Sequence, residues 1–207
     1  GLGVPVFLIP RAFVSGEVTM YQLGFRSLRR TGLAVALTVL LTGASVALYN
    51  PFGMDRSAFA VAFLFLLPTG IASVMICWVL VGTHVQALVR GGGAITSISV
   101  GVIITGILFG LTSRVQFPGA GMTDTLFWYI SAGIVAAIFF FAVRDVWASG
   151  IVVTGVFVYL AAGQLDTTIL HQSFTVISLA AVVSIGVLAG VHWYLSRNFV
   201  TIPVPVG

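Results

Sequence analysis

The sequence predicts an all-α, polytopic integral membrane protein, a bundle of six transmembrane helices with both termini in the cytoplasm. Of its 207 residues, 59% are hydrophobic and only 7% are charged, and its mean hydropathy is +1.15. A soluble domain is usually about 25% charged, and a disordered chain is polar and charged. Both of those classes are therefore excluded, and a membrane protein is the class that remains.

Six apolar segments match, or nearly match, the roughly 20 residues that cross the hydrocarbon core as a helix. They are residues 31–49, 58–82, 93–112, 125–143, 147–162 and 174–195, of which the fifth is the shortest. A barrel strand would instead alternate apolar and polar residues over about 10 positions. Runs such as 134–143 lack that alternation, so we expect helices.

The arginines indicate how the bundle is oriented. All nine basic residues are arginine, and charges fall between the predicted spans. Seven arginines lie on one side of the predicted bundle, either before the first span or after the second, fourth and sixth spans. The other two lie in loops on the opposite side. The seven are Arg11, Arg26, Arg29, Arg30, Arg90, Arg144 and Arg197, and the two are Arg56 and Arg114. The positive-inside rule then puts both termini in the cytoplasm, most simply of a prokaryotic cell. Because this placement explains the net charge of +4, that charge does not indicate a nucleic-acid partner.

The chain divides into a tail with an interfacial helix at 1–30, the bundle at 31–197 and an extended tail at 198–207. Residues 16–30 should form a helix on the membrane surface, because Val18, Tyr21, Phe25 and Leu28 recur at helical spacing. Such a helix either anchors the chain or contacts a cytoplasmic partner. The apolar end segments 1–14 and 199–207 are too short to span, which points to other membrane subunits or further copies of the chain as partners.

Neutral polar side chains form stripes on the first two predicted spans. The first stripe consists of Thr38, Thr42 and Ser45, and the second of Thr69, Ser73 and Cys77. Pro68 lies near the middle of the second span and frees the carbonyl of Leu64. A kink beside hydroxyl groups can line a permeation path or a ligand pocket. The same stripes can equally serve as hydrogen bonds between packed helices.

Titratable groups offer few sites for chemistry. No Asp, Glu, Arg or His falls in the middle of a predicted span, which argues against proton pumps and intramembrane acid–base enzymes. No lysine is present for Schiff-base chemistry, and a single cysteine excludes a cysteine-rich metal site. The remaining ligand or metal candidates are the pair His84 and His192, which could bridge a haem if their helices are neighbours, and the pair Asp166 and His171. The alternatives are ordinary histidines at helix ends for the first pair and an ordinary polar loop for the second, and we expect no catalytic residue, cofactor or metal.

Two further patterns concern packing and turns. Glycine pairs at four-residue spacing, Gly106 with Gly110 and Gly186 with Gly190, let helix backbones approach closely, either within the chain or between subunits. Asp55 and Asp124 each precede an apolar helix, where an aspartate caps the first N–H groups. The glycine run after Arg90 and the turn at 144–146 resemble the Yip family of small trafficking proteins over a few residues only, and carry no function to this chain.

Three functions remain open at this point. The first is a non-catalytic bundle that forms the membrane part of a transport or permease-type assembly. The second is a structural or accessory subunit of a larger membrane complex, for example a respiratory or membrane-oxidase complex whose other chains hold the cofactors. The third is a membrane enzyme or a haem or metal protein. A continuous polar cavity lined by the hydroxyl stripes would favour the first function.

Overall fold

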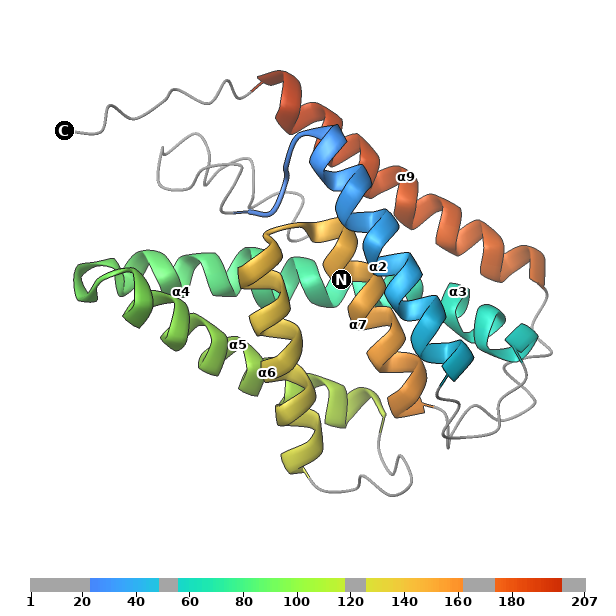
Figure 1. Cartoon of the computed structure of the whole chain (residues 1–207), viewed down its shortest axis with the longest axis horizontal. Coiled ribbons are helices and arrows are strands. Elements are labelled where there is room, and N and C mark those ends of the chain that lie inside the picture. The colour runs from blue at the N-terminus through green and yellow to red at the C-terminus, as the bar shows by residue number, and fades with distance from the viewer. Residues whose placement is uncertain (1–22, 49–55, 118–125, 162–173, 199–207) are drawn as a thin grey trace.

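The computed structural model describes residues 23–48, 56–117, 126–161 and 174–198. Every regular element in these ranges is helical (Figure 1), so the all-α prediction is confirmed. In chain order the elements are α2 (Leu28–Leu48), α3 (Arg56–Ser73), the π-helix η1 (Val74–Gly82), α4 (Thr83–Leu88), the 3₁₀ turn η2 (Arg90–Gly92), α5 (Ala94–Gln116), α6 (Leu126–Val143), α7 (Val146–Ala161) and α9 (Phe174–Asn198). Each of the six apolar segments therefore coincides with a helix in its described part.

Four of these helices are long and apolar enough to cross a membrane by length and composition. They are the continuous helix Ser57–Leu88, the helices Ala94–Gln116 and Leu126–Val143, and the helix Phe174–Ser196. A shorter apolar helix spans Val146–Ala161. The hydrophobic signal in the sequence thus corresponds to membrane-length helices in the structure.

The predicted surface helix at 16–30 is wrong over residues 23–27. Leu23 and Gly24 form a turn, the next three residues have no regular structure, and Leu28 begins α2. The physical reason is that Leu23 and Phe25, both 2% exposed, are buried in the core of the bundle, and the backbone must turn at Gly24, where φ is +81°. Residues 16–22 lie outside the described part of the chain.

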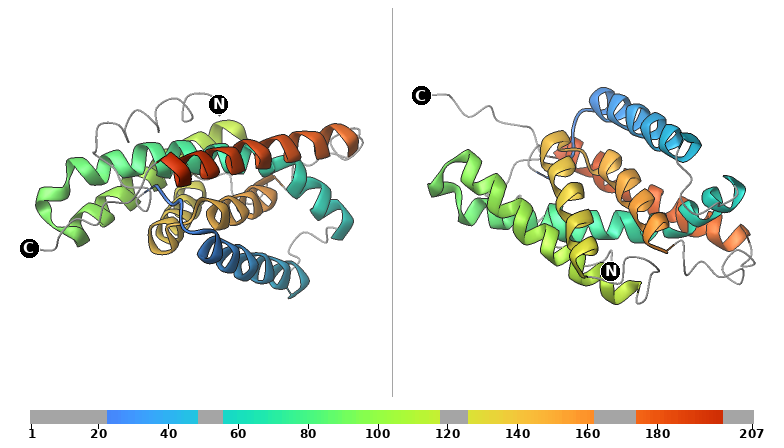
Figure 2. Two further views of the ribbon diagram at one scale, coloured as in Figure 1. Left: turned by 90° about the horizontal axis from the view of Figure 1, so that it is seen from above. Right: turned by 60° about the horizontal axis from the view of Figure 1, so that its bottom comes forward.

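The shortest apolar helix, α7, is the centre of the bundle. It packs against α2, α3 and α6, while α9 packs on α3 and α5 packs along α6 (Figures 1 and 2). Most residues of α7 are buried, including Val153, Thr154 and Phe157. A helix surrounded by others needs little surface of its own, which is consistent with its being apolar on all sides.

The two glycine pairs differ in their surroundings. A Cβ at Gly106 would lie 2.9 Å from the Ile134 backbone nitrogen, and one at Gly110 would lie 2.7 Å from the Ile130 Cα. Those atoms belong to α6, so this pair allows the close approach of α5 and α6 within the chain. Among the described residues, no atom lies within 4 Å of the same position at Gly186 or Gly190 on α9.

The helix that runs from α3 to α4 changes direction and hydrogen-bonding pattern near its middle. Pro68 lies inside α3, and the parts before and after it point in different directions (Figure 2). The nine residues of η1, which begins directly after α3, are π-helical. At the end of η1 the Thr83 N–H donates to the carbonyls of Leu80 and Trp78. This segment carries much of the core.

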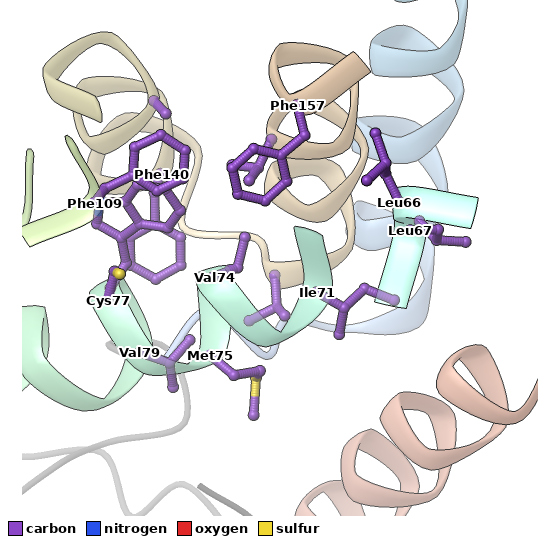
Figure 3. Close-up of a cluster of buried hydrophobic side chains, with 14 of the residues drawn as sticks. Leu66, Leu67, Ile71, Val74, Met75, Cys77, Val79, Phe109, Phe140 and Phe157 are labelled. Atoms are coloured by element: carbon purple, nitrogen blue, oxygen red, sulfur yellow. The ribbon is translucent and has the colours of Figure 1, made fainter. Parts of the chain in front are cut away.

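Aromatic rings fill the space between η1, α5, α6 and α7. Trp78 lies 5.2 Å from Phe109 and 6.3 Å from Phe140, and Phe109 stacks on Phe157 at 5.3 Å, all measured between ring centroids. Figure 3 shows Phe109, Phe140 and Cys77 close together in this cluster. Such ring pairs add to the packing energy of the buried surface.

Gly70→Ala is expected to lower the free energy of unfolding by about 1–3 kcal/mol. A Cβ at Gly70 would meet the Thr154 hydroxyl and lie 3.1 Å from the Thr154 backbone nitrogen, so α3 and α7 would have to separate. The measurement is reversible unfolding by SDS titration in mild detergent. Gly32→Ala is the control, because a Cβ there meets nothing within 4 Å. Equal losses in both variants would contradict the proposed contact.

Candidate functional site

Asp145 is the first member of a buried polar cluster at one end of the bundle. It lies in the two-residue connection between α6 and α7, and its side chain is fully buried. One carboxylate oxygen accepts from the Ala148 N–H at 2.9 Å, and the other accepts from the Thr31 hydroxyl at 2.8 Å. Asp145 therefore caps the first turn of α7 and also ties α2 to it.

The connection is tight because α6 ends in a left-handed residue. Arg144 has φ of 52°, and its N–H donates to the Phe140 carbonyl at 2.7 Å. Its guanidinium donates to the Gln86 side-chain oxygen at 2.8 Å and lies 4.8 Å from the centre of the Phe141 ring. These contacts hold the turn that places Asp145 at the start of α7.

His192 is the second member of the cluster, and both of its ring nitrogens have partners. The Trp147 indole N–H donates to Nδ1 at 3.0 Å, and Nε2 lies 2.7 Å from the Arg26 carbonyl oxygen. An indole N–H can only donate, so Nδ1 is the acceptor and Nε2 carries the proton. The ring of Phe25 meets the imidazole edge-on at 5.5 Å.

Together these contacts attach the segment 23–31 to the rest of the bundle. The Val146 N–H donates to the Gly24 carbonyl at 3.0 Å, which adds a backbone bond to the side-chain bonds of Thr31, Asp145, Trp147 and His192. We call these four side chains the polar cluster. Apart from the local cap that Asp145 forms on α7, these bonds fix one segment against another, which is the geometry of a structural clamp.

Residues of the polar cluster line two neighbouring cavities. The larger, about 600 Å³, is lined by residues of α2, α3, α7 and α9, and we call it the chamber. The smaller, about 330 Å³, is lined by residues of α2 and α9 together with Trp147, and we call it the vestibule. Thr31, Trp147 and His192 line the vestibule. Val35 and Trp147 line both, so the two cavities adjoin.

The three residues of the hydroxyl stripe on the first span differ in exposure and in their contacts. Thr38 is buried and donates to its own helix at the Ala34 carbonyl, at 2.7 Å. Ser45 is exposed and donates to the Thr42 carbonyl at 2.7 Å. Thr42 lines the chamber. Thr38 and Ser45 thus satisfy carbonyls of their own helix.

The stripe on the second span does not line the chamber or the vestibule. Pro68 and Thr69 are half-buried and Ser73 is buried, and none of the three lines either cavity. Of the predicted lining residues, Thr42 alone borders the chamber or the vestibule; the predicted set was Thr38, Thr42, Ser45, Pro68, Thr69 and Ser73. Apolar residues make up the rest of the chamber wall. The structure therefore does not bring the two stripes together around these two cavities.

The histidine candidates are not brought together as a ligand pair. His84 is exposed, and its Nδ1 lies 2.5 Å from the Leu80 carbonyl oxygen of its own helix. His192 is buried in the polar cluster with both nitrogens engaged. Within the described ranges, no three His, Cys, Asp or Glu residues meet to hold a metal ion. Asp166 and His171 lie outside those ranges.

Sequence reasoning missed three of the four cluster residues. In the predicted map Thr31 and Trp147 are only the first residues of two spans, and Asp145 lies in the turn at 144–146. The signal that could have found Asp145 is the one used for Asp55 and Asp124, an aspartate directly ahead of an apolar helix.

Comparison with protein-family models, with curated proteins and with solved structures finds no significant match to this chain. The function is therefore argued from the geometry alone.

Proposed function

We propose that this chain is a non-catalytic, multi-pass subunit of a membrane complex in a prokaryotic cytoplasmic membrane. In this proposal α2, the α3–α4 helix, α5, α6, α7 and α9 cross the bilayer, and both termini lie on the arginine-rich cytoplasmic side. Support comes from the helices long and apolar enough to cross and from the large apolar side chains that α2, α5 and α9 expose, such as Leu40, Ile103 and Val182.

The observation that carries the proposal is the outward glycine pair on α9. Only a narrow stripe of α9 is buried, which includes Ile177, Ala181, Ser184 and Leu188. The opposite surface carries exposed valines and the open pair Gly186 and Gly190. In α5 the same spacing accommodates α6, so in α9 it suits a membrane helix of another chain, either a second copy or a different subunit.

Four buried hydroxyl groups favour a subunit over an aqueous pathway. Thr105, Thr154 and Ser184 each donate to the carbonyl four residues earlier in their own helix, as Thr38 does. Hydroxyls used in this way have no proton left to donate to a hydrated substrate. The membrane part of a transport assembly is the second candidate, favoured by the Pro68 bend and the π-helical η1 next to the chamber wall.

Native mass spectrometry from mild detergent tests the proposal. The wild-type chain should appear with a second copy or a partner subunit, and the double variant Gly186→Ile with Gly190→Ile should appear alone. The reason is that two β-branched side chains would keep another helix backbone away from α9. Ala44→Ile on the exposed surface of α2 is the control and should keep the assembly. A wild-type chain that is a monomer, or a double variant that still assembles, would overturn the proposal.

A further inference from the structure

The chamber and the vestibule form one groove between α2 and α9. The chamber has α2 and α9 as its walls, and α3 and α7 complete its lining. Val35 of α2 and Trp147 of α7 border the chamber and the vestibule alike, so a long molecule can occupy both. At about 600 Å³ the chamber alone has the size of ordinary small-molecule sites, which range from about 300 to 1,000 Å³.

The chamber matches a hydrocarbon chain. Among its lining residues there is no charged side chain, and Thr42 is the only one with a hydroxyl group. The indole N–H of Trp147 is already donated to His192. Phe63, Leu67 and Leu188 are typical of the rest of the wall. Water would find almost no hydrogen-bond partners there, whereas an acyl chain would meet apolar surface on several sides.

The vestibule is also lined mainly by apolar residues, such as Leu28, Val35 and Trp193. It differs from the chamber in its position beside the first turn of α2, and its polar lining residues are Thr31, His192 and Ser196. The first bond of that helix runs from the Thr31 N–H to the Ser27 carbonyl, so the preceding amides lie at its positive end. Arg29 and Arg30 do not line the vestibule, but they belong to the same turn of α2 and are exposed. This end of the groove is therefore complementary to a negative charge.

We propose that the α2–α9 groove binds one phospholipid with an anionic head group. One acyl chain occupies the chamber, and the phosphate lies at the vestibule beside the first turn of α2. The groove joins apolar walls to a positive end, as the two parts of such a lipid require. This site is separate from the α9 surface assigned to another chain, because Gly186 and Gly190 do not line either cavity.

The test measures lipid retained by the full chain after reconstitution in vesicles of equal phosphatidylglycerol and phosphatidylcholine with identical acyl chains. After mild extraction, native mass spectrometry should find one phosphatidylglycerol on each wild-type chain, in preference to phosphatidylcholine. Gly43→Trp should lose this lipid. Gly43 lines the chamber and a Cβ there meets nothing within 4 Å, so the indole can enter the chamber without displacing the backbone.

Ala44→Trp is the matched control, because Ala44 is the next residue, is exposed and does not line the groove. It should retain the lipid. Arg29→Gln with Arg30→Gln should still retain a lipid but lose the preference for phosphatidylglycerol. A phosphatidylglycerol with a photoreactive acyl chain should label α2 and α3 peptides in the wild type and not in Gly43→Trp, which is a second readout if the variant folds poorly.

Three results of the lipid measurement would overturn the proposal. They are a wild-type chain without bound lipid, equal retention by Gly43→Trp and Ala44→Trp, and equal retention of the two phospholipids by the wild type. Seating of a second copy of the chain in the groove, seen as loss of a dimer in Gly43→Trp alone, would also overturn it. A monomer that still holds phosphatidylglycerol would contradict the proposed function and leave the lipid site standing.

Discussion

Gly110→Leu is expected to lower the free energy of unfolding by about 3 kcal/mol, the upper part of the range for overpacked cores. A Cβ at this position would lie 2.7 Å from the Ile130 Cα and 2.8 Å from the Ile130 nitrogen. Backbone atoms cannot rotate away as a side chain can, so α5 and α6 would have to move apart. That movement would also loosen the packing of Phe109, the preceding residue of α5, which is fully buried in the core.

The measurement is reversible unfolding of the monomer in mild detergent by SDS titration, followed by circular dichroism. Gly190→Leu is the matched control, since it makes the same change in the corresponding glycine of the α9 pair. A Cβ at Gly190 meets nothing within 4 Å, so the monomer should change by no more than about 0.5 kcal/mol. The packing argument fails if Gly110→Leu unfolds at the wild-type SDS concentration, or if both variants lose equal stability.

The contrast between the two glycine pairs defines what the sequence could predict about packing. Spacing alone identifies a surface on which a backbone can come close, because the information is local to one helix. It does not say what meets that surface. Gly106 and Gly110 face the backbone of α6, whereas Gly186 and Gly190 have no described neighbour within 4 Å. The spacing is the same in both pairs, so it could not predict this difference.

The helices themselves were predictable for the same reason. Length and hydropathy are properties of a continuous segment, so each predicted span coincides with a helix in its described part. Residues 23–27 were not predictable in this way. Helical spacing of Phe25 with Leu28 indicated a surface helix, but the core recruits Leu23 and Phe25 across a turn at Gly24, and that recruitment is a tertiary effect.

The polar cluster lay beyond sequence reasoning because its partners are far apart. Thr31 and Asp145 are separated by 114 positions, and His192 and Arg26 by 166. The hydroxyl stripes illustrate the complementary error. Helical periodicity identified residues that share a surface, whereas Thr38 and Ser45 use their hydroxyls on carbonyls of their own helix. A polar side chain in a membrane helix therefore need not indicate a polar path.

Asp145→Ala should have the second large effect, a loss of about 2–5 kcal/mol in the free energy of unfolding. Removal of the carboxylate leaves the Ala148 N–H and the Thr31 hydroxyl without their acceptor, and each buried unsatisfied group costs about 1–3 kcal/mol. The helix cap of α7 is lost in the same step. Asp145→Asn keeps one acceptor oxygen, so its loss should be smaller than that of the alanine variant.

The position of the loss distinguishes a clamp from a general packing defect. Asp145 bonds to Thr31 and caps the first turn of α7, and the adjacent Val146 N–H bonds to the Gly24 carbonyl. Amide hydrogen exchange in Asp145→Ala should therefore accelerate in residues 24–31 and in the first turn of α7, and stay unchanged in α5 and α6. A double-mutant cycle with Thr31→Val should give a coupling energy of at least about 0.5 kcal/mol, because the two side chains share one hydrogen bond. Uniform exchange across all helices, or strictly additive losses, would mean that the cluster does not act as a unit. Local exchange with coupling would mean that this single buried aspartate attaches the start of α2 to the centre of the bundle.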